Sequence, residues 1–396
     1  MSFPERFSAL PDYPFARLRA LLDGHPPGGE VVTLSLGEPR NPFPAWLGEV
    51  VAAEAAGFGR YPPNEGSEAL LAAIADWTAR RHGVSPDPER QILALNGSRE
   101  GLFNALLALV PEKRRGRRPA VLIPNPFYQV YAAGALAAAA EPVYVPATAE
   151  TGFLPDFGAL DGETLARAAA LVICSPSNPQ GAVAGEDYLA RLIALAERHD
   201  ILIIADECYS ELYRDAPPPG ILTAAARAGA DPERVLAINS LSKRSNVPGL
   251  RAGLAVGGPE AIARMRMLRA YGGAPLPLPL QAAAARLWAD EAHVEDNRAR
   301  YRRKYALADH VLAGVPGYRP PDAGFFLWLP VEDGEAAALR LWRGAGIRAL
   351  PGAYLGREAA GGNPGRGWLR VALVADEDSL ATALTRLRET LYDRGE

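Results

Sequence analysis

The sequence predicts an α/β fold, with a large domain built on a mostly parallel seven-stranded sheet in three α/β/α layers and a smaller α+β domain. The first observation is length, because 396 residues exceed the size at which one hydrophobic core stops growing. The second is an alternation of short apolar runs and helical stretches between residues 91 and 257, typical of parallel strands covered on both faces. The third is a change of pattern after residue 257.

Ahead of the sheet the sequence predicts three elements. We expect a short helix over residues 12–24, after a proline-rich arm, and a strand over 31–37 that ends on a glycine. Apolar residues at helical spacing predict an amphipathic helix over 67–82. Residues 1–7 carry charge and proline without an apolar core, so we expect no secretory signal peptide.

Seven apolar runs are predicted as strands of the large sheet: residues 92–95, 120–123, 142–145, 170–174, 201–205, 235–238 and 253–256. Helical patterns separate several of them, over 100–110, 127–139 and 188–198. Ligands of such sheets bind at the ends of strands. The unusual polar residues of this chain follow these runs, so we expect the site there.

The C-terminal part reads as a second unit. Its predicted elements are a helix over 259–271, a Pro-Leu loop over 276–280, a long helical stretch over 281–313, strands over 325–329, 347–350 and 368–374, and a final helix over 379–392. We therefore expect three parts: residues 1–40 as an N-terminal arm and part of the small domain, 41–275 as the large domain, and 276–396 as the small domain.

Composition excludes several classes of function. The net charge of −4 gives no electrostatic argument for binding nucleic acid or an anionic membrane, and no stretch approaches the ~18 apolar residues of a membrane span. The two cysteines, Cys174 and Cys208, lie in apolar runs, as expected for reduced thiols of a cytoplasmic protein. The five histidines are scattered, so we expect no metal site.

One lysine stands out among the three in the chain. Lys113 lies in a charged run over 112–118 that reads as a solvated loop, and Lys304 lies in a basic helical stretch over 298–304. Lys243 alone follows a buried strand among small residues. A poorly solvated amine loses its proton more easily and becomes a usable nucleophile. We therefore expect Lys243 to form a Schiff base with a cofactor aldehyde.

Other polar residues at strand ends fit the same cofactor. Asp206 ends an apolar run, where a carboxylate is costly unless a cation meets it or it caps the next segment. Asn178 lies in a proline-rich turn that is also ordinary turn punctuation. Arg370 lies within a strand and is either solvent-facing or a clamp for a carboxylate. Residues 96–100 place glycine and serine where a helix begins, as a phosphate requires. Together they match the needs of pyridoxal phosphate.

These segments resemble the fold type I pyridoxal-phosphate aminotransferases of class I and II, over nearly the whole chain. The motifs are Ser-Pro-Ser-Asn-Pro-x-Gly at 175–181, Asp-Glu-x-Tyr at 206–209, Ser-x-Ser-Lys at 240–243 and Gly-x-Arg-x-Gly at 249–253. The resemblance implies that Lys243 is the Schiff-base lysine and proton shuttle. It also implies that Asp206 pairs with the pyridine nitrogen, that Tyr209 and Asn178 contact the phenolate oxygen, and that Tyr128 stacks on the ring.

The resemblance further implies the residues that hold phosphate and substrate. Those expected at the phosphate are Gly97, Ser98 and Arg99 through the helix N-terminus, together with Ser240 and Arg251. Arg370 is expected to clamp the substrate α-carboxylate, with Asn178 and the backbone of Gly37 beside it. Tyr61 is expected to reach the phosphate of a neighbouring subunit, which implies a homodimer with shared sites.

The segments over 13–22, 125–131 and 242–251 are most similar to the N-succinyldiaminopimelate aminotransferases of bacterial lysine biosynthesis. That similarity implies ping-pong transfer between N-succinyl-LL-2,6-diaminopimelate and 2-oxoglutarate. Residues 271–275 read Tyr-Gly-Gly-Ala-Pro where those enzymes are expected to have Tyr-His-Gly. The alternatives are another amino donor (aspartate, alanine or LL-diaminopimelate) or a C–S lyase on the same fold. A ligand-sensing regulator is disfavoured, since about thirty residues before the first strand are too few for a DNA-binding domain.

Overall fold

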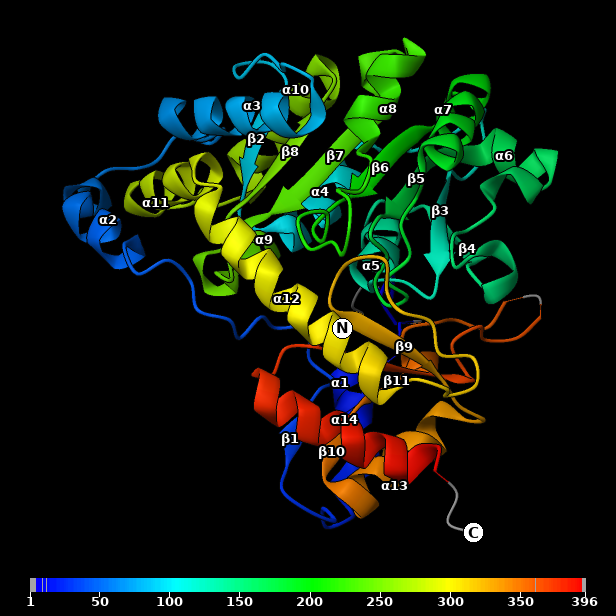
Figure 1. Cartoon of the computed structure of the whole chain (residues 1–396). Helices are drawn as coiled ribbons and strands as arrows, with labels where there is room; N and C mark the ends of the chain where they lie inside the picture. The colour runs from blue at the N-terminus through cyan, green and yellow to red at the C-terminus, as the bar shows by residue number, and fades with distance from the viewer. Residues whose placement is uncertain (1–4, 9, 12, 360, 394–396) are drawn as a thin grey trace, which may run out of the picture.

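The computed structural model describes residues 5–8, 10–11, 13–359 and 361–393. Its centre is a seven-stranded sheet in the order β2-β8-β7-β6-β5-β3-β4 (Figure 1). Strand β8 runs antiparallel to both of its neighbours, and the other pairs are parallel. The strands are β2 (Ile92–Leu95), β3 (Ala120–Asn125), β4 (Glu141–Pro146), β5 (Ala168–Cys174), β6 (Leu202–Asp206), β7 (Val235–Ser240) and β8 (Gly253–Gly257). The predicted α/β class and mostly parallel seven-stranded sheet are confirmed.

Helices cover both faces of this sheet, so its strands are continuously apolar. One face carries α3 (Glu68–His82), α7 (Glu186–His199), α8 (Ile221–Ala228) and α11 (Leu278–Ala289). The other carries α4 (Ser98–Leu109), α5 (Val130–Ala137) and α10 (Pro259–Gly272). Shorter helices α2 (Leu47–Ala53) and α6 (Gly162–Arg167) lie at the edges. Burial on both faces explains why each strand reads as an uninterrupted apolar run.

A second group of elements lies below the sheet in Figure 1. It contains a three-stranded antiparallel sheet of β11 (Leu350–Pro351), β12 (Trp368–Ala372) and β9 (Phe326–Pro330), and a parallel pair of β1 (Val32–Thr33) and β10 (Ile347–Arg348). Helices α1 (Pro14–Leu22), α12 (Ala292–Val311), α13 (Gly334–Ala345) and α14 (Glu377–Leu391) pack around these strands. The expected domain boundaries stay a prediction.

Three sequence expectations differ from the structure. The strand expected over 347–350 is two strands in different sheets, because the chain leaves one sheet and joins the other at Ala349. The helix expected over 281–313 is broken at Asp290. The Asp290 carboxylate accepts a hydrogen bond from the N–H of Ala292 (2.8 Å), a local bond that competes with helix continuation and begins α12. The strand expected over 31–37 is only two residues long.

Two further points concern the chain ends and the helices. The helix expected over 12–24 is α1, and Asp12 lies outside the described residues, as do residues 1–4 of the N-terminal arm. Helices α8 and α13 carry no sequence-based expectation. Among the helices that the structure describes, none is both long enough and apolar enough to cross a membrane.

Candidate active site

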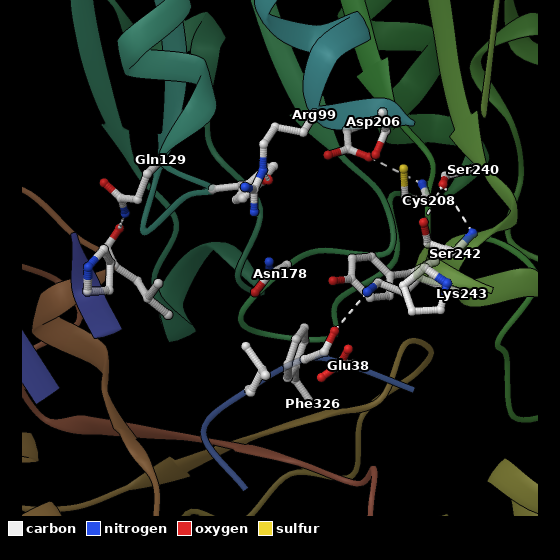
Figure 2. Close-up of a pocket in the computed structure, with 18 of the residues that line it drawn as sticks. Glu38, Arg99, Gln129, Asn178, Asp206, Cys208, Ser240, Ser242, Lys243 and Phe326 are labelled. Atoms are coloured by element: carbon white, nitrogen blue, oxygen red, sulfur yellow. Dashed lines mark hydrogen bonds between the residues drawn. The ribbon is translucent and has the colours of Figure 1, made fainter. Parts of the chain in front are cut away.

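A cavity of about 410 Å³ opens at the carboxyl edge of the seven-stranded sheet, where β5, β6 and β7 end (Figure 2). Its walls also include the start of α4, the segment before α1 and parts of β9 and β12. The residues expected in a site that line it are Gly37, Ser98, Arg99, Tyr128, Asn178, Asp206, Tyr209, Ser240, Lys243, Arg251 and Arg370. Parallel strands bring their carboxyl ends to one edge, which explains why residues so far apart in sequence meet here.

Lys243 lies one residue before the end of α9 (Leu241–Arg244), directly after β7. Ser240 caps this short helix by accepting a hydrogen bond from the N–H of Ser242 (3.1 Å). The Lys243 amine donates to the carbonyl of Gly37 (2.7 Å). Burial lowers the pKa of Lys243 to about 8. A substantial fraction of the amine is therefore neutral near physiological pH, and it faces the cavity as a nucleophile and base.

Asp206 is the last residue of β6 and is almost completely buried. Its carboxylate accepts hydrogen bonds from the Tyr131 hydroxyl (2.7 Å) and the Cys208 N–H (3.2 Å). Burial raises the pKa of Asp206, and the hydrogen bonds from Cys208 and Tyr131 together with the charge of Lys243 oppose that rise. No cationic side chain within the described residues forms an ion pair with it. A buried carboxylate that lines a cavity in this way suits a cationic ligand.

The start of α4 forms an end of the cavity rich in hydrogen-bond donors. Gly97 precedes the helix with φ +82°, and a side chain there would collide with the Arg251 guanidinium at 2.3 Å. Arg251 donates to the carbonyls of Pro248 (2.8 Å) and Asn96 (3.2 Å), and within the described chain no carboxylate pairs with it. The Ser240 hydroxyl donates to that of Ser242 (2.9 Å). Free N–H groups at a helix start, a guanidinium and hydroxyls suit a phosphate.

Arg370, on β12, is the second kind of cation in the cavity. It is only 4% exposed. Its guanidinium donates to the Asn178 side-chain oxygen (2.9 Å) and the Ser35 carbonyl (2.7 Å) and stacks on the Phe326 ring at 4.2 Å. Burial lowers the pKa of Arg370 to about 10, so it stays protonated at neutral pH. Its Nε is buried without a partner, and no carboxylate pairs with it in the part of the chain that is described.

Arg99 adds a third cation at the mouth. Its side chain donates to the hydroxyls of Tyr128 (2.5 Å) and Tyr13 (3.5 Å). The hydrogen bond to Tyr128 raises the pKa of Arg99, and burial raises the pKa of Tyr128 to about 12. Figure 2 shows Arg99 and Lys243 on different sides of the cavity, with Asn178 between them. Across the described residues, no carboxylate forms an ion pair with Arg99.

Two expected residues lie away from the cavity lining. Gly97 is adjacent to it, packed against Arg251. Tyr61 follows the 3-10 helix over Ala55–Gly59, and its side chain is fully exposed at 102%. Tyr209 lines the cavity and packs edge-on against Phe325 at 5.4 Å between ring centres. The roles expected for these residues stay proposals.

Sequence reasoning missed several residues of the cavity. Tyr131 looked like core because it lies in an apolar helical stretch, and its only signal was its place three residues after Tyr128. Glu38 and Cys208 were hidden within motifs whose neighbours attracted attention. Both cysteines are free and buried. No group of His, Cys, Asp and Glu able to hold a metal occurs within the described residues.

Comparisons with known proteins agree with this arrangement. A family model described as "Aminotransferase class I and II" matches residues 29–387. The LL-diaminopimelate aminotransferase of Desulforudis audaxviator is 35% identical, over 99% of this chain and 99% of that protein. The crystal structure of an aminotransferase from Neisseria meningitidis has a TM-score of 0.92 at 37% identity, covering 96% of this chain and 98% of that one. A probable N-succinyldiaminopimelate aminotransferase from Thermus thermophilus has a TM-score of 0.82 at 28% identity, covering 95% and 100%.

Proposed function

Because the chain belongs to the class I and II aminotransferase family, we propose that it transfers the amino group of a dicarboxylic amino acid, LL-diaminopimelate, to 2-oxoglutarate. The chain is a pyridoxal-phosphate-dependent aminotransferase. The proposal adds the substrate and the roles of individual residues. The observation that carries the substrate class is a second cation in the cavity, Arg99, besides Arg370.

The residues of the cavity fit pyridoxal phosphate. Asp206 presents a buried carboxylate to a protonated ring nitrogen, and Lys243 presents an amine to the aldehyde. The backbone N–H groups of Ser98 and Arg99 and the guanidinium of Arg251 suit the phosphate. The side chain of Arg99 is already bonded to Tyr128, so its contribution to the phosphate would be through its backbone.

Bound pyridoxal phosphate supplies an aldehyde that takes up the amino group and a ring that delocalises the charge left when the α-proton is removed. Lys243 accepts that proton, because its lowered pKa of about 8 makes the neutral amine accessible. The Gly37 carbonyl holds the free amine at 2.7 Å. Asp206, held by Tyr131, stays ionised against a cation, and Arg370 orients the substrate α-carboxylate. Two half-reactions at one site predict ping-pong kinetics.

The second carboxylate of the substrate pair is assigned to Arg99. An exposed guanidinium fixed by two phenol hydroxyls is pre-organised for a carboxylate, and it needs no change of charge to bind one. Glu38 also lines the cavity and forms no ion pair within the described residues. A carboxylate there favours a donor with a free distal ammonium. LL-diaminopimelate carries both groups, in keeping with the name of the Desulforudis relative.

The second candidate donor is N-succinyl-LL-diaminopimelate. It is favoured by the Thermus structure and by the segment similarities of the sequence. Its succinyl group replaces the distal ammonium with another carboxylate, so Glu38 would repel it. This charge difference makes the two donors separable by mutation.

We also propose a homodimer with shared sites. The support is an exposed aromatic group: Phe43 (55%), Phe58 (57%), Tyr61 (102%) and Tyr271 (89%). Large exposed aromatic side chains are typical of protein interfaces. In such a dimer the hydroxyl of Tyr61 would serve the phosphate of the other copy. Sedimentation of the cofactor-bound enzyme, and the affinity of Tyr61→Phe for the cofactor, test this.

The substrate proposal is tested with a panel of amino donors and 2-oxoglutarate. LL-Diaminopimelate is expected to have the highest kcat/KM, above N-succinyl-LL-diaminopimelate, aspartate and alanine. Replacing Arg99 by Gln should raise KM for dicarboxylic donors about 10-fold or more while alanine changes little. Replacing Glu38 by Gln should narrow the gap between the two diaminopimelates. A preference for alanine, or release of ammonia and pyruvate without transfer, contradicts the proposal.

A further inference from the structure

A hydrogen-bond network lies outside the cavity, behind Lys243. The side chain of Asn297 on α12 donates to the backbone carbonyls of Lys243 (3.2 Å) and Arg244 (3.3 Å). Its oxygen accepts hydrogen bonds from Asn246 (3.0 Å) and from Asn41 (2.9 Å). Every donor and acceptor of this buried amide is therefore used. Asn297 joins the segment that carries the lysine to the loop after Gly37.

Lys304 completes this network from the same helix. It lies seven residues after Asn297, and so on the same face of α12. Its amine donates to the side-chain oxygen of Asn41 (2.9 Å). Asn41 thus receives one hydrogen bond from Lys304 and donates one to Asn297. Figure 1 shows that α12 runs from the large sheet down to the lower group of elements.

The loop fixed by Asn41 contacts both cations of the substrate site. Within four residues of Asn41, the Gly37 carbonyl accepts from Lys243 (2.7 Å). Two residues earlier, the Ser35 carbonyl accepts from Arg370 (2.7 Å). Pro39 lies between Gly37 and Asn41 and restricts the backbone, so a displacement at Asn41 is transmitted along the loop. The position of the Gly37 carbonyl therefore depends on how Asn41 is held.

Stability gives no reason to keep an amine at this place. Lys304 is 1% exposed, and in the described part of the chain no carboxylate forms an ion pair with it. Burial lowers the pKa of Lys304 to about 8, against the longer-range attraction of Glu377 and Asp376. A buried amine with a single amide partner is costly, and apolar replacements of buried charges are often neutral or stabilising. A costly group that persists points to a requirement other than stability.

We propose that Lys304 is a positioning residue for the transamination reaction: through Asn41 and Asn297 it holds the Gly37 carbonyl where the free amine of Lys243 is oriented for proton transfer. The inference rests on the proposed role of Lys243 and is independent of which amino donor the enzyme prefers. Lys304 touches neither substrate nor cofactor. Its effect is expected on the proton-transfer step and little on substrate binding.

The test compares Lys304→Met with Arg303→Met in the cofactor-bound enzyme. Methionine keeps the apolar stem of Lys304 and removes its donor. Arg303 is the preceding residue, and its exposed pair with Glu377 (2.9 Å) makes it a matched charge control. For Lys304→Met, kcat should fall roughly 10- to 100-fold with KM within about 2-fold, since small misplacements of catalytic groups cost this much. The isotope effect with α-deuterated glutamate should rise, while the thermal midpoint stays equal or increases. Arg303→Met should match the wild type.

A double-mutant cycle with Asn41→Ala separates positioning from general structure. If Lys304 acts through Asn41, the double variant should lose no more kcat than the worse single variant, within about 2-fold. Hydrogen exchange should quicken in residues 34–42 and 241–246 alone, by about 10-fold for one lost hydrogen bond. Additive losses of kcat, an unchanged kcat, or a lowered thermal midpoint with unaltered kinetics overturns the inference. A wild type without a cofactor absorbance band instead refutes the role of Lys243, which separates the two failures.

Discussion

Two regions of this molecule place a lysine in the interior, and they differ in what the amine meets. Lys243 at the end of β7 lines a cavity with Asp206, Tyr209 and Arg370, whereas Lys304 in α12 meets one asparagine in a packed helix face. Burial lowers the pKa of both amines to about 8. A perturbed pKa therefore does not by itself identify a nucleophile. Access to a cavity whose other walls can bind the reaction partners is what distinguishes Lys243.

The largest expected effect tests this contrast directly. Replacing Lys243 by Ala should lower kcat by about 10⁴-fold or more, because it removes both the covalent attachment and the base. The cofactor absorbance band of the purified enzyme should change with it. Lys304→Met should retain the band at wild-type intensity. Equal losses in the two variants would mean that the cavity does not distinguish the two lysines.

The second effect concerns the cation that only the Lys243 region possesses. Replacing Arg370 by Lys should lower kcat/KM by about 10²-fold for every amino donor, because a lysine cannot reproduce the bidentate geometry while it contacts Asn178 and Ser35. Steady-state kinetics with alanine and with a dicarboxylic donor measures this. A loss confined to dicarboxylic donors would move the α-carboxylate site away from Arg370.

A smaller effect is expected at Tyr131, which supports Asp206 from behind. Replacing Tyr131 by Phe removes a hydrogen bond to a buried carboxylate, worth about 1.5–3 kcal/mol. The pKa of Asp206 should rise further, since that hydrogen bond lowers it in the wild type. Activity should therefore fall about 10-fold, most strongly at acidic pH, where the carboxyl becomes protonated. The pH profile of kcat decides, and a uniform loss at all pH values argues for a packing defect instead.

The smallest effect is on stability, and it concerns the region of Lys304. The pKa of Lys304 is lower in the folded chain than its ordinary value of 10.5, so the unfolded state binds more protons between pH 8 and 10.5. The stabilisation associated with the neutral amine is complete above 10.5 and is lost as pH falls through about 8. Relative to Lys304→Met, the wild type should gain on the order of 2 kcal/mol over this window. Denaturant unfolding at several pH values measures the difference, and a flat difference contradicts the burial cost.

Much of the fold could be predicted because strands and helices leave local patterns. All seven strands of the large sheet were expected within a few residues of their observed bounds, since burial on both faces makes each one continuously apolar. The break at Asp290 and the switch at Ala349 were not expected. Both depend on a single residue at which the chain changes direction, and neither disturbs the apolar pattern around it.

The candidate site divides in the same way. Residues at strand ends, such as Lys243, Asp206 and Asn178, were found because a polar group after an apolar run is visible in the sequence. Tyr131 and Lys304 were not. Tyr131 reads as part of an apolar helix and Lys304 as part of an exposed basic one, and their partners lie 75 and 263 residues away.

The sequence by itself determined the fold class, the order of the strands along the chain and the lysine at the end of one of them. Periodicity and the exhaustion of an apolar run are local properties, and they need no knowledge of neighbours. The tertiary structure decided which groups face that lysine and which second lysine is buried. Those facts depend on packing between segments distant in sequence, where a hydrogen bond forms only once both segments are in place.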